Sequence, residues 1–173
     1  SYLQSYIDLL KANHNIILNG APGTGKTHLA KEIAKEMNAT VKMVQFHPSY
    51  DYTDFVEGLR PIKDEKGNIC FERKDGVFKE FCKKAINEPT SPFVFIIDEI
   101  NRGEISKIFG ELFYSIDPGY RGEKGKVQTQ YQNLVEEGDV FKEGFYVPEN
   151  VYIIGTMNDI DRSVESMDFA MRR

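Results

Sequence analysis

This sequence has little cysteine, and it lacks long apolar runs and a leader-like N-terminus. Its two cysteines, Cys70 and Cys82, do not have the partner spacing of a disulfide framework or a zinc site. No apolar run approaches the ~18 residues that a membrane helix requires, and the first residues do not follow the basic-then-apolar order of a signal peptide. We therefore expect a cytoplasmic protein without membrane contact.

Positive charge is also in the minority. The chain carries 22 Lys and Arg against 27 Asp and Glu, a formal net charge of −5, so electrostatics do not favour binding of nucleic acid by this segment alone. Hydrophobic residues make up 40% and charged residues 28%, which is typical of a folded domain. We expect one domain over residues 1–173. Since the chain begins without Met and stops within a helical pattern, we interpret it as a piece of a longer protein.

Segments typical of strands alternate along the chain with segments of helical spacing. Short apolar runs predict strands at residues 15–18, 41–46, 93–97 and 151–155. Helical spacing predicts helices at residues 1–12, 26–37, 77–87, 105–116 and from 164 onward. A hairpin is expected within residues 61–75, where Lys-Gly and Asp-Gly pairs flank an apolar stretch. This alternation favours an α/β fold with a mostly parallel sheet between two layers of helices.

Residues 117–148 differ in composition from the rest of the chain. They contain five glycines and many charged residues, with little apolar periodicity. We interpret them as an inserted hairpin or mobile loop, because loops this long without structure of their own are uncommon in compact domains. Arg121, Lys124 and Lys126 are candidates for contact with DNA or a partner, although the mixed charge favours a solvated loop.

Residues 20–27 carry the strongest single motif. The run Gly-Ala-Pro-Gly-Thr-Gly-Lys-Thr matches G-x-x-x-x-G-K-[ST] in full, between a predicted strand and a predicted helix. Glycines let backbone N–H groups turn around an anion, and the helix N-terminus adds the positive end of its dipole. The loop therefore predicts a site for the phosphates of a nucleotide. The nucleotide-binding candidates are Gly20, Ala21, Pro22, Gly23, Thr24, Gly25, Lys26, Thr27 and His28.

Two carboxylates at the end of the strand predicted at 93–97 supply the partners that such a loop needs. Lys26 is expected to reach the β- and γ-phosphates, and Thr27 to offer its hydroxyl to Mg²⁺. Asp98 can hold the same Mg²⁺, and Glu99 can orient or deprotonate the attacking water. Alone, Asp98-Glu99 is equally consistent with the start of a solvated loop, but together with the phosphate loop it favours hydrolysis of a nucleoside triphosphate.

A third polar residue, Asn158, follows the strand predicted at 151–155. At the tip of a strand beside the one at 93–97, its amide can hydrogen-bond the attacking water or the γ-phosphate, a placement that resembles the sensor-1 Asn of AAA+ ATPases. The alternative is an Asn that forms a turn or caps a helix.

Longer stretches resemble one family within the AAA+ class, the McrB subunits of McrBC restriction systems, which act on DNA with modified cytosine. The resemblance covers nearly the whole chain. It rests on Met-Asn-x-x-Asp-Arg-Ser at 157–163, Gln-Phe-His-Pro-Ser-Tyr-Asp-Tyr at 45–52, Asp-Phe-Val-Glu-Gly-Leu-Arg-Pro at 54–61, Asp-Glu-Ile-Asn-Arg at 98–102 and the run at 145–155. Ala21 departs from it, since Pro is common there in the family, but the turn should still form.

The resemblance implies a P-loop NTPase fold of AAA+ type, a three-layer α-β-α sandwich with a mostly parallel central sheet and an inserted hairpin or loop. It implies Mg²⁺-dependent hydrolysis of GTP, self-association into a hexameric ring, a McrC-like nuclease subunit as partner, and contact with DNA through the full-length complex. Asp161 would help to arrange the catalytic water, alongside Glu99 and Asn158. Arg172 or Arg173 would reach the γ-phosphate of the neighbouring subunit, unless both only end a solvated helix. The helical lid of AAA+ proteins is absent from this stretch.

Other functions stay open on the residues alone. The phosphate loop and Asp98-Glu99 treat ATP and GTP alike, so an ATP-hydrolysing AAA+ remodelling enzyme is the main alternative. A P-loop kinase of small molecules would need an acceptor pocket, but neither Asn158 nor the arginines at 172 and 173. A nucleotide switch that binds without hydrolysis would not need Glu99.

Overall fold

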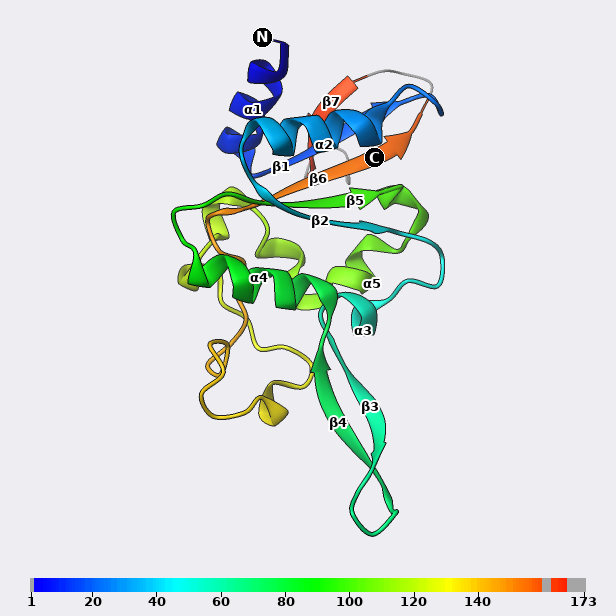
Figure 1. The fold of residues 1–173 in the computed structure, drawn as a ribbon, viewed down its shortest axis with the longest axis vertical. Helices are drawn as coiled ribbons and strands as arrows, with labels where there is room; N and C mark the ends of the chain where they lie inside the picture. The colour runs from blue at the N-terminus through cyan, green and yellow to red at the C-terminus, as the bar shows by residue number, and fades with distance from the viewer. Residues whose placement is uncertain (1, 160–162, 168–173) are drawn as a thin grey trace.

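A five-stranded sheet forms the centre of the molecule. The structure, a computed structural model, describes residues 2–159 and 163–167. In the sheet the strands follow the order β2-β5-β6-β1-β7 (Figure 1). Three parallel pairings join β2, β5, β6 and β1, whereas β7 runs antiparallel to β1. The expected mostly parallel sheet is thus confirmed. Its strands are β1 (Asn15–Gly20), β2 (Thr40–Gln45), β5 (Phe93–Asp98), β6 (Val151–Asn158) and β7 (Ser163–Ser166).

Helices cover both faces of this sheet, which gives the three layers visible in Figure 1. One face carries α1 (Tyr2–Asn13) and α2 (Lys26–Glu36), and the other carries α3 (Tyr52–Phe55), α4 (Val77–Asn87) and α5 (Ile105–Phe109). None of the helices in the described ranges is long and apolar enough to cross a membrane.

The alternation of side chains along β5 explains why this strand is apolar throughout. Val94 and Ile96 pack into the core under α1 and α2, while Phe93, Phe95 and Ile97 pack into the core under α4 and α5. Because successive side chains of a strand point to opposite faces, a central strand between two helical layers must be apolar at every position. β5 is thereby held firmly, with the polar Asp98 at its carboxyl end.

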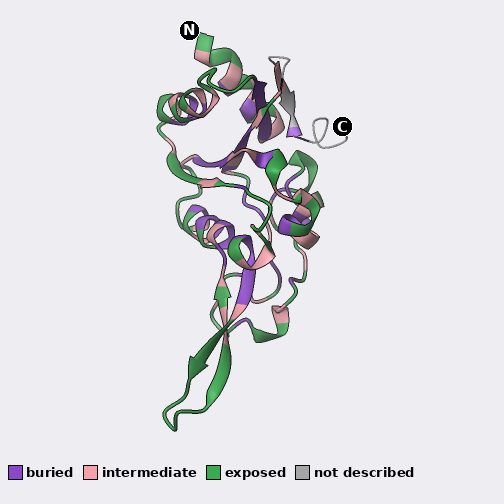
Figure 2. Cartoon of the chain, turned by 90° about the vertical axis from the view of Figure 1, so that its right-hand side faces the viewer, coloured by how far each residue is buried: buried purple, intermediate pink, exposed green. Residues whose placement is uncertain are grey.

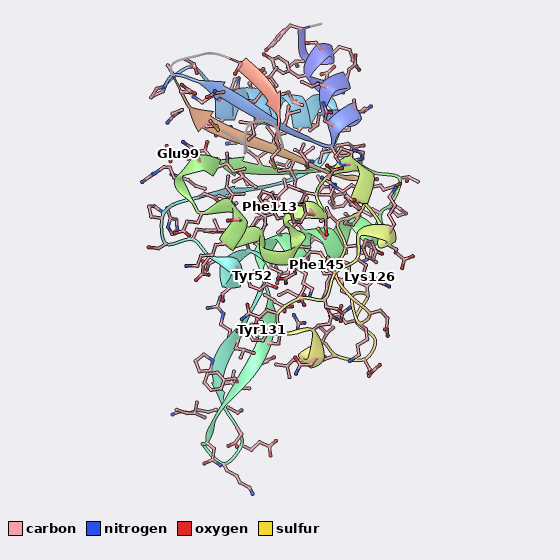
Figure 3. All side chains as sticks on the ribbon, turned by 180° about the vertical axis from the view of Figure 1, so that it is seen from behind. Tyr52, Glu99, Phe113, Lys126, Tyr131 and Phe145 are labelled. Atoms are coloured by element: carbon pink, nitrogen blue, oxygen red, sulfur yellow. The ribbon has the colours of Figure 1, made fainter. Side chains whose placement is uncertain are left out.

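A two-stranded hairpin, β3 (Glu57–Lys63) and β4 (Ile69–Asp75), projects from the body. Figure 2 shows its distal half exposed, with the buried residues gathered between the layers of the body. The root of the hairpin is anchored by the fully buried Glu57, whose carboxylate accepts from Lys79 Nζ at 2.9 Å and from the backbone N–H of Tyr131 at 2.6 Å. Figure 3 shows Tyr131 beside this root and Tyr52 just above it.

Residues 117–148 are packed rather than solvated. They form three short 3-10 turns, Pro118–Tyr120, Glu123–Gly125 and Gln132–Leu134, and one β-bridge between Val127 and Phe145. Phe141 and Phe145 lie in the main core. Arg121 is 1% exposed, so this side chain is neither the candidate contact for DNA or a partner nor part of the solvated loop that the mixed charge favoured. Its guanidinium lies inside the protein and donates hydrogen bonds to backbone carbonyls.

Two helix predictions are also corrected. The helix expected over 105–116 ends at Phe109, because Gly110 adopts a left-handed φ of +56° and a 3-10 helix, Gly110–Tyr114, follows. Met167 is helical and residues 168–173 lie outside the described ranges, but residues 164–166 of the helix expected from 164 onward belong to β7 instead. Its ladder with β1 satisfies backbone groups on the outer edge of β1, which a helix would leave unpaired.

Candidate active site

The phosphate loop connects the end of β1 to the start of α2. Gly23 and Gly25 have φ values of +79° and +78°, a left-handed conformation that favours glycine. A Cβ at either position would meet no atom within 4 Å, so glycine is required by the backbone conformation and not by lack of space. No side chain caps the N-terminus of α2. Its first N–H groups are therefore available to an anion, as the motif predicts.

The side chain of Lys26 folds back onto this loop and donates hydrogen bonds to its backbone. Its ammonium donates to the carbonyl oxygens of Gly20 at 3.0 Å and Ala21 at 2.9 Å. The hydroxyl of Thr24 also donates to the Ala21 carbonyl, at 2.8 Å. These bonds keep the positive charge at the mouth of the loop, where phosphate oxygens can replace the carbonyls as its acceptors.

One carboxylate oxygen of Asp98 accepts hydrogen bonds from two threonine hydroxyl groups. Thr27 Oγ1, in the first turn of α2, donates to Asp98 Oδ1 at 2.9 Å, and Thr156 Oγ1, on β6, donates to the same atom at 2.6 Å. A hydroxyl and a carboxylate oxygen this close are hard donors that suit Mg²⁺, which is commonly held by one or two carboxylates together with substrate phosphates. The described residues contain no group of three or more His, Cys, Asp or Glu that could hold a metal by itself.

Glu99 follows Asp98 in an unusual backbone conformation. Its φ of +51° is left-handed, which costs a residue other than glycine on the order of 1–3 kcal/mol and is typical of functional sites. The carboxylate accepts hydrogen bonds from Gln45 at 2.7 Å, from Arg102 at 3.2 Å and from Asn158 at 3.4 Å. Figure 3 shows Glu99 at the carboxyl end of β5, far from the hairpin. The sequence-predicted pair Glu99 and Asn158 is thus brought into contact.

These groups line a common cleft of about 260 Å³. Its lining combines the loop, the start of α2 and the ends of β5 and β6, in the residues Pro22, Gly23, Gly25, Lys26, Thr27, His28, Asp98, Glu99 and Asn158. Gly20, Ala21 and Thr24 belong to the loop without lining the cleft. Asp161, Arg172 and Arg173 lie outside the described residues.

Sequence reasoning missed three residues that contact the site, Gln45, Arg102 and Thr156. Gln45 ends β2 in register with Asp98, and Thr156 follows the residue of β6 that is paired with Ile97. The signal that could have found Gln45 and Thr156 was their place at the end of a predicted strand, because the carboxyl ends of parallel strands meet at one edge of the sheet. Arg102 lies instead in the 3-10 helix Ile100–Arg102 that follows β5. The order of the strands in the sheet, however, cannot be predicted from the local sequence.

The comparison with known proteins assigns the family. Residues 15–173 match the AAA domain of the dynein-related subfamily. The chain belongs to this AAA family. Its members bind and hydrolyse nucleoside triphosphates, so the cleft at the end of the phosphate loop is the expected place for the nucleotide.

Individual relatives refine this result. This AAA domain is 44% identical over 176 residues to the type IV methyl-directed restriction enzyme EcoKMcrB subunit of Escherichia coli K12, covering 99% of the chain and 36% of the relative. It is 28% identical over 187 residues to the type II restriction enzyme BsuMI component YdiS of Bacillus subtilis 168, covering 92% of the chain and 54% of the relative. The resemblance to McrB is confirmed.

A third relative has a name outside restriction systems. The AAA domain is 33% identical over 147 residues to the proteasome-activating nucleotidase of Sulfurisphaera tokodaii, covering 84% of the chain and 29% of the relative. The chain thus spans between 29% and 54% of the length of these relatives. Two of these relatives are named as components of restriction enzymes and the third as a nucleotidase.

Proposed function

We propose that this AAA domain is the GTP-hydrolysing core of a ring-forming motor that moves DNA for a restriction complex, with cleavage by a separate McrC-like nuclease subunit. The observation that carries the proposal is the convergence of Lys26, the Thr27–Asp98 pair and the Glu99–Asn158 pair on one cleft. The 44% identity to an McrB restriction subunit supports a role in a restriction complex, and GTP, the ring and the nuclease partner are proposed from the resemblance to the McrB family.

Binding begins at the N-terminus of α2. The N–H groups of the loop surround the phosphates, and the Lys26 ammonium exchanges the carbonyls of Gly20 and Ala21 for phosphate oxygens. This exchange replaces neutral acceptors with charged ones, which makes the hydrogen bonds shorter and stronger. Affinity for the triphosphate therefore depends on Lys26 whichever base is attached.

The Mg²⁺ that accompanies the nucleotide would be held by Thr27 and Asp98. When bound, such an ion neutralises charge on the β- and γ-phosphate oxygens. Because both protein donors lie at the ends of rigid elements, α2 and β5, they keep the γ-phosphate at a defined distance from Glu99. Positioning of this kind is the main contribution of a protein to phosphoryl transfer.

Glu99 is the proposed base that orients the attacking water and accepts its proton, with the Asn158 amide as a second hydrogen-bond partner of that water. In the described geometry the Glu99 carboxylate is bound by Gln45 and Arg102. It must exchange part of these bonds for the water before hydrolysis. Asp161 and one of Arg172 and Arg173 are proposed to complete the site, the arginine across a subunit boundary.

The alternative function is an ATP-hydrolysing AAA+ remodelling enzyme, favoured by the 33% identity to a proteasome-activating nucleotidase. The groups in the cleft act on phosphates and metal and do not select a base. Membership in the AAA family disfavours the small-molecule kinase.

Calorimetric titration with slowly hydrolysed GTP and ATP analogues, in the presence of Mg²⁺, tests the proposal on the chain extended beyond Arg173. A preference for the GTP analogue of tenfold or more, about 1.4 kcal/mol or above, is expected. Lys26→Ala should abolish binding of both analogues, whereas Glu99→Gln should bind like the unaltered chain and fail only in turnover. Equal binding or an ATP preference would move the function to the remodelling enzyme, and absence of binding would contradict both.

A further inference from the structure

One buried hydroxyl connects the two carboxylates of the site. Thr156 lies on β6, 1% exposed. Its Oγ1 donates to Asp98 Oδ1 at 2.6 Å and accepts the backbone N–H of Glu99 at 3.1 Å. A single side-chain atom thus contacts the proposed metal ligand and the backbone of the proposed base.

The direction of each hydrogen bond leaves the hydroxyl no freedom. A carboxylate can only accept and a backbone N–H can only donate, so the threonine proton must point to Asp98 and a lone pair to Glu99. The bond to the Glu99 N–H also supports the left-handed backbone (φ +51°, ψ +49°) from which the Glu99 side chain leaves the strand. An apolar side chain such as Val or Ala can make neither bond.

Thr27 and Thr156 share the same acceptor atom but differ in what else they can do. Thr27 lines the cleft and is the proposed Mg²⁺ ligand, so its hydroxyl is expected to turn from Asp98 toward the cation. Thr156 does not line the cleft. It is therefore the donor that stays on Asp98 once the cation has bound.

We propose that Thr156 is a positioning residue for the Mg²⁺-dependent reaction, because it aims the Asp98 carboxylate at the cation and holds the backbone of Glu99. The inference rests on the proposed function. It predicts that the hydroxyl of Thr156, rather than its methyl group, determines how tightly Mg²⁺ binds together with the nucleotide.

Two substitutions separate the hydroxyl from the methyl group. Thr156→Val keeps the size and branching of the side chain and removes the hydroxyl, whereas Thr156→Ser keeps the hydroxyl and removes the methyl. Binding of fluorescent GTP and ATP derivatives is measured during Mg²⁺ titration, together with steady-state turnover of the triphosphate that the unaltered chain hydrolyses. For Thr156→Val, metal-free nucleotide affinity should stay within about twofold, while the Mg²⁺ midpoint rises and kcat falls by about 10–100-fold, as for other groups that orient metal ligands. Thr156→Ser should stay close to the unaltered chain in all three.

Several outcomes would overturn the inference. A Thr156→Val chain with an unchanged Mg²⁺ midpoint and kcat would show that the hydroxyl is not needed, and equal defects in Thr156→Ser and Thr156→Val would assign the effect to packing. If Thr156→Val does not fold, Thr156→Ala and Thr156→Ser replace the comparison, since both lack the methyl and differ only in the hydroxyl. Absence of turnover in the unaltered chain would count against the proposed function instead, and the Mg²⁺ titration of nucleotide binding would still test Thr156.

Discussion

Arg121 is a cation buried without a carboxylate partner among the described residues. Its guanidinium donates to the carbonyls of Ile116 at 2.8 Å and Pro148 at 3.2 Å, to that of Val151, and to the Asn15 side chain at 2.6 Å. Burial lowers the pKa of Arg121 to about 10, which still leaves it protonated at neutral pH. This one side chain therefore joins β1, β6 and both ends of the 117–148 segment.

Replacement of Arg121 tests that role. Arg121→Met keeps most of the apolar stem but leaves several buried acceptors without a donor, each worth about 1–3 kcal/mol. We expect the free energy of unfolding to fall by about 3–5 kcal/mol, as measured by urea denaturation. The exposed Lys124 supplies the control, since Lys124→Met should change stability by less than about 0.5 kcal/mol. A loss below about 1 kcal/mol for Arg121→Met would contradict the assignment.

At the scale of elements, an ionic network joins the hairpin, α4 and the 117–148 segment. Lys83 Nζ, on α4, lies 2.5 Å from an oxygen of Asp75 on β4 and 2.7 Å from one of Asp139. Arg73 adds a contact of 2.7 Å to Asp75. All four side chains are at most 27% exposed, so the network is screened less than a surface pair.

The pKa shifts within this network give its pH dependence. Burial is the largest single influence and opposes ionisation of Asp75 and Asp139, but hydrogen bonds from Lys83, together with Arg73 at Asp75 and the Phe141 backbone at Asp139, and the nearby positive charges hold both pKa values below the usual 3.8. The pKa of Lys83 is raised above 10.5 by the same partners, against the opposing effect of burial. The carboxylates thus stabilise the fold fully above their usual pKa and lose this effect as the pH falls through the lowered values. Lys83 contributes fully below 10.5 and loses its effect as the pH rises through its raised pKa.

A comparison of thermal and urea unfolding across pH checks this network. Lys83→Met should lower the free energy of unfolding by about 2 kcal/mol, with a constant deficit from about pH 5 to 10 that shrinks as the pH falls below about 4. The neighbouring Lys84 is exposed, and Lys84→Met should have little effect at any pH. The network would be refuted by a deficit that persists unchanged at pH 2, or by equal effects of the two substitutions.

At the scale of the whole molecule, the proposed ring requires that one chain complete the site of the next. If Arg172 or Arg173 acts on the neighbour's γ-phosphate, each complete site consists of the cleft of one subunit and an arginine of the next. A substitution in the cleft and a substitution of the arginines then damage different halves of the site. We expect Glu99→Gln, and the double change Arg172→Ala with Arg173→Ala, each to reduce turnover by roughly 10³-fold or more. An equimolar mixture of the two variants should recover a measurable part of the activity, because some boundaries then pair an intact cleft with intact arginines.

The control for this mixture is a pair of variants defective in the same half of the site. Lys26→Ala mixed with Glu99→Gln leaves no boundary with an intact cleft and should remain inactive. Turnover per chain should also rise with protein concentration in the unaltered protein. A mixture that stays as inactive as its separate components would contradict action across a subunit boundary.

The element predictions that held are those with a strong local pattern. Helix α4 was expected and found over the same residues, 77–87, and the hairpin lies where the Lys-Gly and Asp-Gly pairs indicated. The helix predicted at 105–116 ends early, and residues 164–166 of the one predicted from 164 form a strand, for different reasons. Gly110 permits a left-handed conformation that periodicity does not reveal, and residues 163–166 pair with an edge that lies over 140 positions earlier in the chain.

The sequence by itself determined the phosphate loop, the Asp98–Glu99 pair, Asn158 at a strand end and the alternation of strands and helices, because each depends on residues that are neighbours in the chain. Only the tertiary structure decided that Gln45 binds Glu99 across 54 positions, that Thr156 joins Asp98 to Glu99 across 58 and 57, and that Arg121 is buried. These contacts depend on the order of strands in the sheet. That order is set by the packing of both faces and the pairing of every buried backbone group, and no local segment of the sequence contains that information.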